Sequence, residues 1–321
     1  AGGDFGHAAV IVEEIARSGV SGLGFGLHSD VVAPYIERLG TEAQKSQWLP
    51  KCAAGEVILA VAMSEPGAGS DLKAIRTTAR REGDEYVING AKTFISNGLN
   101  CDLVVVVAKT QPELGSKGVS LILVEADRPG FRKGRKLDKM GQEAADTAEL
   151  FFDDVRVPQR YRVGEEGMGF IYQMEQFQLE RLWAGFNGVG AMRHILKITI
   201  DYTRERQVFG KSLLDNQWVY FKLAELRAEI EMLSTLCWAA VEKVVAGEDA
   251  TEWATMVKLK SGRLMREVTD TCVQFWGGMG FADGRVSRAF RDGRLASIGG
   301  GADEVMLQIL SKYMGIFPRN A

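Results

Sequence analysis

Apolar positions recur along the chain with two different periods, and the changes between them divide it into three parts. Residues 1–58 have a helical pattern: the stretch FGHAAVIVEEIARSG closes on Gly19, and TEAQKSQWLPKCAAG opens with Thr41 as an N-cap. From about residue 59 to 165, short apolar or alternating runs are separated by Gly, Asn, Asp and Pro, which predicts strands and turns. Long helical periods then return and predict helices over 168–199, 202–212, 216–247 and 250–276. The pattern therefore predicts helices, a β-domain and a helical bundle.

Composition and charge exclude several classes of protein. The chain has 321 residues, 46% of them hydrophobic and 25% charged, and a net charge of −3, which is no footprint for nucleic acid or an anionic membrane. It has no run of about 18 apolar residues and no signal-peptide pattern. The four cysteines form no CxxC motif and the three histidines lie far apart, so no metal site is expected and a reducing compartment fits.

Two short segments of the β-section are rich in small and hydroxyl residues. In AMSEPGAGSD, Ser64 and Ser70 flank a Gly-Ala-Gly turn whose backbone N–H groups can reach a ligand, although a plain hairpin loop has the same composition. In TFISNG, the pair Asn97-Gly98 predicts a turn, and Phe94 and Ser96 precede it on one face. An aromatic ring and a hydroxyl on one face suit either a flat ligand ring or the core.

Two further segments lie in the helical part. In RERQVFGKSLLDNQ, arginines flank a glycine break and suit a phosphate, although a solvated helix end explains them equally well. In VQFWGGMGF, Gly277 and Gly278 end an apolar helix and read, taken alone, as a C-terminal cap.

Taken in order along the chain, these segments resemble the acyl-CoA dehydrogenase family of flavoproteins. The resemblance extends from GLHSDVVAPYIERLGTEAQKSQWLPKCAAGE through AMSEPGAGSDL, INGAKTFISNG, MGQEAADTAELFFDDVRVP, ERQVFGKSL and QFWGGMGF to RDGRLASIGGGADEVM. It implies an α+β multidomain fold: an N-terminal helical domain (1–58), a central β-barrel or sandwich domain (59–165) and a C-terminal four-helix bundle (166–321). Family members normally carry several dozen residues before the position where this chain begins, so the N-terminal domain is expected to be partial.

The resemblance also implies a cofactor, FAD, and assigns residues to it. Ser64, Ser70, Phe94 and Ser96 match positions around the flavin ring and ribityl phosphate, and the backbone of Met63 matches a position against the ring. Arg206, Phe209 and Gln217 match residues that reach the ADP half, usually from a neighbouring subunit. Gln274, Gly277 and Gly278 match the pyrophosphate-binding stretch, and Glu304 a position near the adenine. Such shared sites imply an oligomer, commonly a tetramer.

The family removes the α-proton of an acyl-CoA thioester with a carboxylate, which most members carry in a Glu-Gly-Thr sequence. Laid on that pattern, the glutamate position here is Gly300, whose backbone N–H is expected to hold the thioester carbonyl. Isovaleryl-CoA and long-chain acyl-CoA dehydrogenases carry the base on another helix, and their Glu-Arg pattern is matched by QFQLERLWAG. Glu180 is therefore the expected base, in place of a plain surface pair with Arg181.

Substrate and partners follow from the same resemblance. Ser70, Arg181 and Gly299 match positions near the CoA and thioester, and the room left by the glycines at 299–301 favours a long or branched acyl chain, as in the isovaleryl-, long-chain and citronellyl-CoA branch. Electron-transfer flavoprotein is the expected acceptor, and the expected location is the bacterial cytoplasm or the mitochondrial matrix. A flavin acyl-CoA oxidase that uses dioxygen and a non-catalytic acyl-CoA-binding member of the fold are the alternatives.

Overall fold

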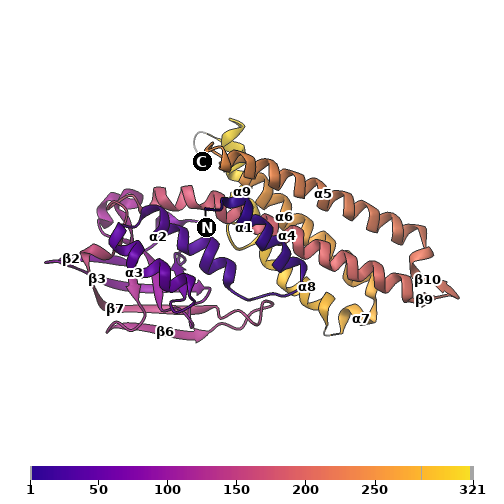
Figure 1. Cartoon of the computed structure of the whole chain (residues 1–321), viewed down its shortest axis with the longest axis horizontal. Helices are drawn as coiled ribbons and strands as arrows, with labels where there is room; N and C mark the ends of the chain where they lie inside the picture. Colours follow the sequence, from indigo (N-terminus) through magenta and orange to yellow (C-terminus); the bar gives the residue numbers. More distant parts are fainter. Residues whose placement is uncertain (1, 283, 319–321) are drawn as a thin grey trace. The chain divides into compact units, whose positions relative to one another are not determined.

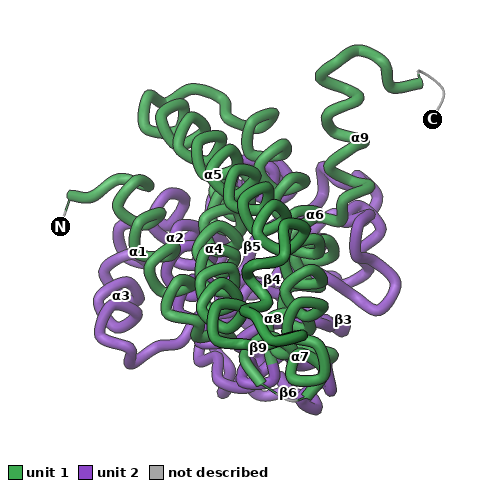
Figure 2. Tube along the Cα trace, turned by 90° about the vertical axis from the view of Figure 1, so that its right-hand side faces the viewer, with its two compact units in different colours: residues 1–21, 140–142, 178–321 green, residues 22–139, 143–177 purple. Residues whose placement is uncertain are grey.

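The computed structural model describes residues 2–282 and 284–318, and these residues form two compact units (Figures 1 and 2). One unit consists of residues 22–139 and 143–177, and the other of residues 1–21, 140–142 and 178–321. Each unit has its own hydrophobic core. The first predicted helical part is thus divided between the units, and the three-domain division with boundaries at 58 and 165 stays a prediction.

The unit built on residues 22–139 and 143–177 is a β-structure covered by short helices (Figure 1). Its helices are a π-helix η1 (Leu27–Val32), α2 (Ala33–Leu39) and α3 (Glu42–Ala53). Its strands are β1 (Leu59–Ala62), β2 (Thr78–Glu82), β3 (Glu85–Ile95), β4 (Leu103–Lys109), β5 (Val119–Glu125), β6 (Phe131–Lys136), β7 (Ala148–Pro158) and β8 (Arg162–Val163). Apolar residues of α2 and α3, such as Ile36 and Trp48, share one core with the strands.

The eight strands form two groups joined by a single residue pair. The order is β6-β7-β3-β2-β4-β5-β8, and β1 pairs with β4 in parallel from Leu59↔Leu103 to Ala62↔Val106. Between β2 and β4 only Thr78 and Lys109 pair. The other neighbours are antiparallel, with full registers such as β4 on β5. Every residue of strand β4 except the last is buried. Side chains on both faces of this strand are therefore covered, which explains its continuous run of apolar residues.

The other unit is helical (Figure 1). It contains α1 (Phe5–Arg17), α4 (Gly169–Glu205) from residue 178 onward, a hairpin of β9 (Gln207–Val208) and β10 (Lys211–Ser212), α5 (Gln217–Val245), α6 (Thr251–Trp276), α7 (Gly278–Phe281), α8 (Arg285–Gly293), the 3₁₀ turn η6 (Arg294–Ser297) and α9 (Asp303–Tyr313). Helices α4, α5 and α6 supply most of the core, to which α1 adds Ala9 and Val12.

One of the helices predicted from the sequence is not present in the structure. The predicted helix over 202–212 does not exist, because α4 continues to Glu205 and residues 207–212 form the β9–β10 hairpin. The glycine that interrupts the apolar pattern, Gly210, has a φ of +78° and lies at the hairpin turn, where a positive φ is required. The sequence break is therefore a change of backbone direction and not a gap between two helices.

The predicted cap at Thr41 is confirmed. The Thr41 hydroxyl accepts a hydrogen bond from the Gln44 backbone N–H at 3.2 Å, and the Thr41 backbone N–H donates one to the Gln44 side-chain oxygen at 2.9 Å, which is a capping box. We expect Thr41→Ala to lower the free energy of unfolding by about 1 kcal/mol, because one helix N–H loses its partner. Urea unfolding measures this change, and Ser46→Ala, exposed within the same helix, is the neutral control. Equal effects of the two substitutions would contradict the assignment.

Candidate active site

The segment after β1 is a loop fixed by backbone hydrogen bonds at both of its ends. The N–H of Thr93 donates to the carbonyl oxygen of Ser64 at 3.0 Å, which ties the loop to β3. Glu65 and Ala68 exchange backbone hydrogen bonds at 2.9 and 3.0 Å. Met63 and Ser64 are half-buried, whereas Ser70 is exposed. The loop thus presents a hydroxyl, Ser70, beside glycines whose backbone is open on one side, since a Cβ at Gly67 or Gly69 would meet nothing within 4 Å.

A buried ion pair lies under this loop, and sequence analysis missed it. The ammonium group of Lys92 donates to the Met63 carbonyl at 3.0 Å and to the Glu65 carboxylate at 2.9 Å. Glu65 also accepts hydrogen bonds from the backbone N–H groups of Arg76 and Thr77 at 2.6 and 3.0 Å. Both side chains are almost fully buried. The pair therefore fixes the peptide that follows Met63.

The charges of this pair survive burial at neutral pH. Burial lowers the pKa of Lys92 to about 8, although the Glu65 carboxylate opposes the shift. Burial also acts to raise the pKa of Glu65, but the charge of Lys92 and the hydrogen bonds it accepts hold that pKa below its ordinary value. The burial of Lys92 could have been predicted from the alternation of side chains along the strand, which places Lys92 on the same face as Ile88.

The end of β3 is strained at an exposed aromatic residue. Phe94 has a φ of +59° and its side chain is 70% exposed, although the neighbouring Ile95 is buried. The register between β3 and β7 shifts between Lys92 and Ile95, which is where Phe94 departs from strand geometry. Asn97, at the predicted turn, also has a φ of +59°. An exposed aromatic residue in this conformation makes Phe94 a candidate for a functional role.

We expect Phe94→Gly to raise the free energy of unfolding of the cofactor-free protein by about 1 kcal/mol, because glycine adopts a positive φ without strain. The same change is expected to weaken flavin binding, since the exposed ring is lost. Urea unfolding and a fluorescence titration with FAD measure the two effects. Phe281→Gly, an exposed Phe within helix α7, is the control and is expected to lower stability. A loss of stability in both variants would show that Phe94 is not strained.

In the helical unit, Glu180 and Arg181 lie side by side on α4, but in different surroundings. Glu180 is half-buried and Arg181 is 6% exposed. Arg181 donates to the Thr255 hydroxyl on α6 at 3.1 Å. Burial lowers the pKa of Arg181, although the Glu180 carboxylate opposes this. A buried arginine does not fit the alternative of a solvated surface pair.

The glycine turn between η6 and α9 lies on the same α6 helix. Gly300 and Gly301 have φ values of +65° and +104°, which other residues rarely adopt. The ammonium group of Lys258 donates to the carbonyl oxygens of Ala296 and Gly301 at 2.6 and 3.0 Å. Arg181 of α4 binds Thr255, three residues before Lys258 on α6, so contacts from α4 and from the glycine turn both reach this part of α6. Lys258 was not predicted, although it lies on the apolar face of α6, four residues after Ala254 and seven before Met265.

The two carboxylates after the turn differ in environment. Asp303, the first residue of α9, is 7% exposed, and one of its oxygens lies 3.8 Å from the Arg263 guanidinium. Glu304 is exposed at the same helix N-terminus. Gly299 precedes them, and a Cβ at this position would lie 3.1 Å from the Leu295 side chain. The turn therefore brings Gly299 against Leu295 of η6 and Gly300 near Lys258 of α6, and Glu304 stays at the surface.

The remaining predicted residues gather near the far ends of α4 and α6. Tyr202 stacks on Trp276 with ring centroids 4.1 Å apart and donates to its carbonyl at 3.3 Å, which joins these two helix ends. Arg206, four residues after Tyr202, and Gln274, two residues before Trp276, are both exposed. Gly277, with a φ of +55°, caps α6 as predicted, and a Cβ at Gly277 or Gly278 would meet nothing within 4 Å. The backbone here is open to a ligand.

The hairpin next to this region carries a fully exposed aromatic residue. Phe209 has a φ of +49° and projects from the β9–β10 turn with no burial by its own chain. Gln217, the first residue of α5, is also exposed. Leu213 donates its N–H to the Arg206 carbonyl at 2.8 Å, so the hairpin is anchored at its base.

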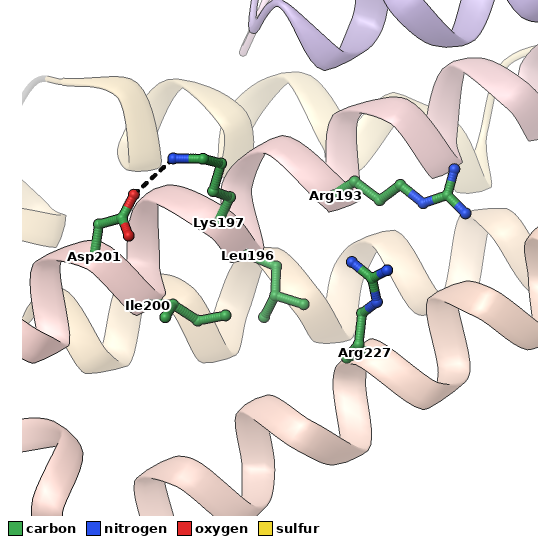
Figure 3. A pocket seen from close by; sticks show the side chains of 6 residues that line it. All are labelled: Arg193, Leu196, Lys197, Ile200, Asp201 and Arg227. Atoms are coloured by element: carbon green, nitrogen blue, oxygen red, sulfur yellow. Dashed lines mark hydrogen bonds and ion pairs between the residues drawn. The ribbon is translucent and has the colours of Figure 1, made fainter.

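A groove on the surface of the helical unit holds none of the predicted residues. It has a volume of about 280 Å³ and lies between α4 and α5 (Figure 3). Its lining residues are Arg193, Leu196, Lys197, Ile200, Asp201 and Arg227. Lys197 pairs with Asp201 at 2.8 Å, and both arginines pair with Glu231. Because its charges are already compensated within the chain, this groove is not part of the candidate site.

Comparison with known proteins places the chain in one family over almost its whole length. Models of the acyl-CoA dehydrogenase N-terminal, middle and C-terminal domains match residues 1–56, 60–155 and 167–315. The long-chain specific acyl-CoA dehydrogenase of Rattus norvegicus mitochondria is 42% identical over 98% of this chain and 74% of its own length. The isovaleryl-CoA dehydrogenase of Oryza sativa mitochondria is 33% identical over 96% of this chain and 76% of its own.

Solved structures agree with this placement. The crystal structure of an acyl-CoA dehydrogenase from Geobacillus kaustophilus has a TM-score of 0.95 and 43% identity, covering 97% of this chain and 83% of that one. The helical N-terminal part, the central β-structure and the C-terminal helices therefore have the fold of that family. Within residues 2–282 and 284–318, no helix is both long and apolar enough to cross a membrane.

The family uses FAD, and the residues present fit this cofactor. Hydroxyl donors and open glycine backbone lie around Ser64 and Ser70, and an exposed Phe94 is held in a strained conformation beside them. Open glycine backbone and the exposed Arg206 lie at the ends of α4 and α6, where N–H groups and a guanidinium suit phosphate oxygens. The chain belongs to the acyl-CoA dehydrogenase family of FAD-dependent oxidoreductases.

Proposed function

We propose that Glu180 is the base that removes the α-proton of the acyl-CoA thioester. The observation that carries this proposal is the combination of a glycine at 300 with a half-buried carboxylate at 180. The position of the common family base has no side chain, and Glu180 lies beside the buried Arg181, which contacts the same α6 helix that supports the glycine turn. Glu304, the exposed carboxylate after the turn, lies at the surface and is a poor candidate.

The chain supplies two groups to the reacting thioester. Glu180 accepts the α-proton, and the Gly300 N–H donates a hydrogen bond to the carbonyl oxygen, where negative charge develops as the proton leaves. Gly299 lets the backbone approach this oxygen closely, and Arg181 holds the Glu180 region through Thr255. The FAD cofactor would supply the acceptor for the hydride that leaves the β-carbon.

We infer that the cofactor is held by the residues that the sequence indicates. Met63, Ser64, Phe94 and Ser96 bind the flavin ring and ribityl chain, and Ser70 lies near the CoA as well. Gln274, Gly277 and Gly278 bind the pyrophosphate, while Glu304 lies towards the adenine. Arg206, Phe209 and Gln217 are exposed on their own chain, which supports contact with the ADP half of a cofactor bound by a neighbouring subunit.

We propose a long-chain acyl-CoA as substrate. The long-chain relative is 42% identical to this chain and the isovaleryl relative 33%, which favours the former of the two substrates left open by the sequence. We also propose a homotetramer that passes electrons to electron-transfer flavoprotein, in the bacterial cytoplasm or the mitochondrial matrix. These assignments rest on the family.

Anaerobic mixing of the FAD-loaded protein with acyl-CoA thioesters tests the function. We expect the visible flavin band to bleach with each oxidisable thioester and fastest with a chain of about 16 carbons. A panel of butyryl-, isovaleryl-, octanoyl- and palmitoyl-CoA covers the alternatives. Fastest bleaching with isovaleryl-CoA would replace the long-chain proposal, and no bleaching with any thioester would support a non-catalytic binding protein.

Oxygen uptake separates a dehydrogenase from an oxidase. With palmitoyl-CoA and air but no electron-transfer flavoprotein, we expect turnover far slower than with that acceptor present. Rapid oxygen consumption without the acceptor would identify an oxidase.

A further inference from the structure

The glycine turn at residues 299–301 is anchored at its start, where the Gly299 N–H donates to the Leu295 carbonyl oxygen at 2.9 Å, but its middle and end depend on two unusual glycine conformations. Gly300 and Gly301 both have a positive φ, and glycine is the residue whose backbone is least restricted. The turn joins the short η6 to α9 and is only partly buried. A backbone N–H used for catalysis must nevertheless be fixed to within a fraction of an ångström. Something outside the turn must therefore hold it.

Lys258 makes the contacts that such a support requires. It projects from α6, is 2% exposed, and donates to a carbonyl before the turn, Ala296 at 2.6 Å, and to one at its end, Gly301 at 3.0 Å. Its stem lies directly against the middle of the turn, since a Cβ at Gly300 would be 3.5 Å from the Lys258 Cε. One side chain thus joins η6, which precedes the turn, to the last residue of the turn, and packs against its centre.

Burying the charged ammonium group of Lys258 costs desolvation free energy, which its hydrogen bonds must offset. Burial lowers the pKa of its ammonium group to about 8, the Asp303 carboxylate opposes that shift, and the positive charge of Arg181 adds to it. A methionine would fill similar space without this desolvation cost. The buried ammonium group is explained if the carbonyl oxygens of Ala296, before the turn, and Gly301, at its end, need a donor.

We propose that Lys258 is a positioning residue for the reaction: it holds the Gly299–Gly301 turn so that the Gly300 N–H meets the thioester carbonyl oxygen. The inference rests on the proposed role of Gly300. Lys258 itself touches neither the substrate nor the reacting atoms. Its removal displaces the N–H that stabilises the developing charge and leaves the residues proposed to bind FAD in place.

The test is Lys258→Met, compared with Lys260→Met. Lys260 is an exposed lysine on the same α6 helix and pairs with Glu229 of α5. Stopped-flow measurement under anaerobic conditions gives the limiting rate constant of flavin reduction and the dissociation constant of palmitoyl-CoA. We expect Lys258→Met to lower the rate constant about 10- to 100-fold and to change the dissociation constant less than about 3-fold. Lys260→Met is expected to match the wild type.

Each outcome separates this inference from the proposed function. If the wild type is not reduced by any acyl-CoA, the proposed function fails. If the wild type is reduced and Lys258→Met, with FAD bound, is reduced equally fast, only the role of Lys258 fails. Should Lys258→Met not fold with FAD, Lys258→Gln takes its place, because its amide ends one bond short of the ammonium group and cannot keep both hydrogen bonds. An unchanged rate constant in that variant overturns the proposal, and a fall at an unchanged dissociation constant supports it.

Discussion

Glu180→Gln is expected to slow flavin reduction by acyl-CoA about 100- to 10,000-fold while leaving FAD and substrate bound. The amide has nearly the shape of the carboxylate but cannot accept the α-proton, and general base catalysis contributes about 10² to 10⁴ in rate. Gly300 offers no side chain to replace it. Anaerobic stopped-flow absorbance measures the reduction, and the visible spectrum with a ligand titration shows that both molecules still bind.

A second substitution on the same helix controls for the loss of a negative charge. Glu175→Gln removes an exposed carboxylate of α4 whose nearest cation, Arg38, lies 3.9 Å away, and it is expected to leave the rate constant within about 2-fold. Normal bleaching in Glu180→Gln would remove Glu180 from the mechanism. In that case Asp303, the buried carboxylate after the glycine turn, becomes the next residue to substitute.

Lys92→Met is expected to lower the free energy of unfolding by about 3–5 kcal/mol, the largest stability effect that we predict. It leaves the Glu65 carboxylate, 8% exposed, without its cationic partner, and removal of one partner of a buried pair costs about this much. It also removes the donor to the Met63 carbonyl, so FAD binding is expected to weaken. Urea unfolding followed by circular dichroism measures the loss.

Two further variants test whether the stability loss in Lys92→Met is caused by the burial of the unpaired Glu65 carboxylate. The double variant Glu65→Gln/Lys92→Met removes both charges of this pair, so more than half of the stability lost in Lys92→Met is expected to return. Lys197→Met breaks a pair in which the lysine is 75% exposed, and it is expected to cost less than about 1 kcal/mol. A loss in Lys92→Met no larger than that in Lys197→Met would mean that the buried pair does not stabilise the fold.

Much of the local structure could be predicted from the sequence, because the signals involve neighbouring residues. The Thr41 cap depends on Gln44 three residues later, and the Asn97-Gly98 turn and the Gly277 cap depend on backbone conformations that few residues adopt. The order of the motifs likewise indicated the family. The prediction of a helix over 202–212 was wrong because the β9–β10 hairpin has strands of only two residues. Such strands are too short to show the alternation of apolar and polar residues that identifies a strand.

The sequence by itself determined the family, the cofactor and the absence of a base at Gly300, since each is carried by a short motif or a single residue type. Only the tertiary structure decided how these motifs are held. Lys92 finds Glu65 27 residues away, and Lys258 reaches carbonyls 38 and 43 residues away. A lysine in a sequence is expected at the surface. It is buried only where the fold brings enough acceptors together to offset its desolvation, and those acceptors come from distant parts of the chain.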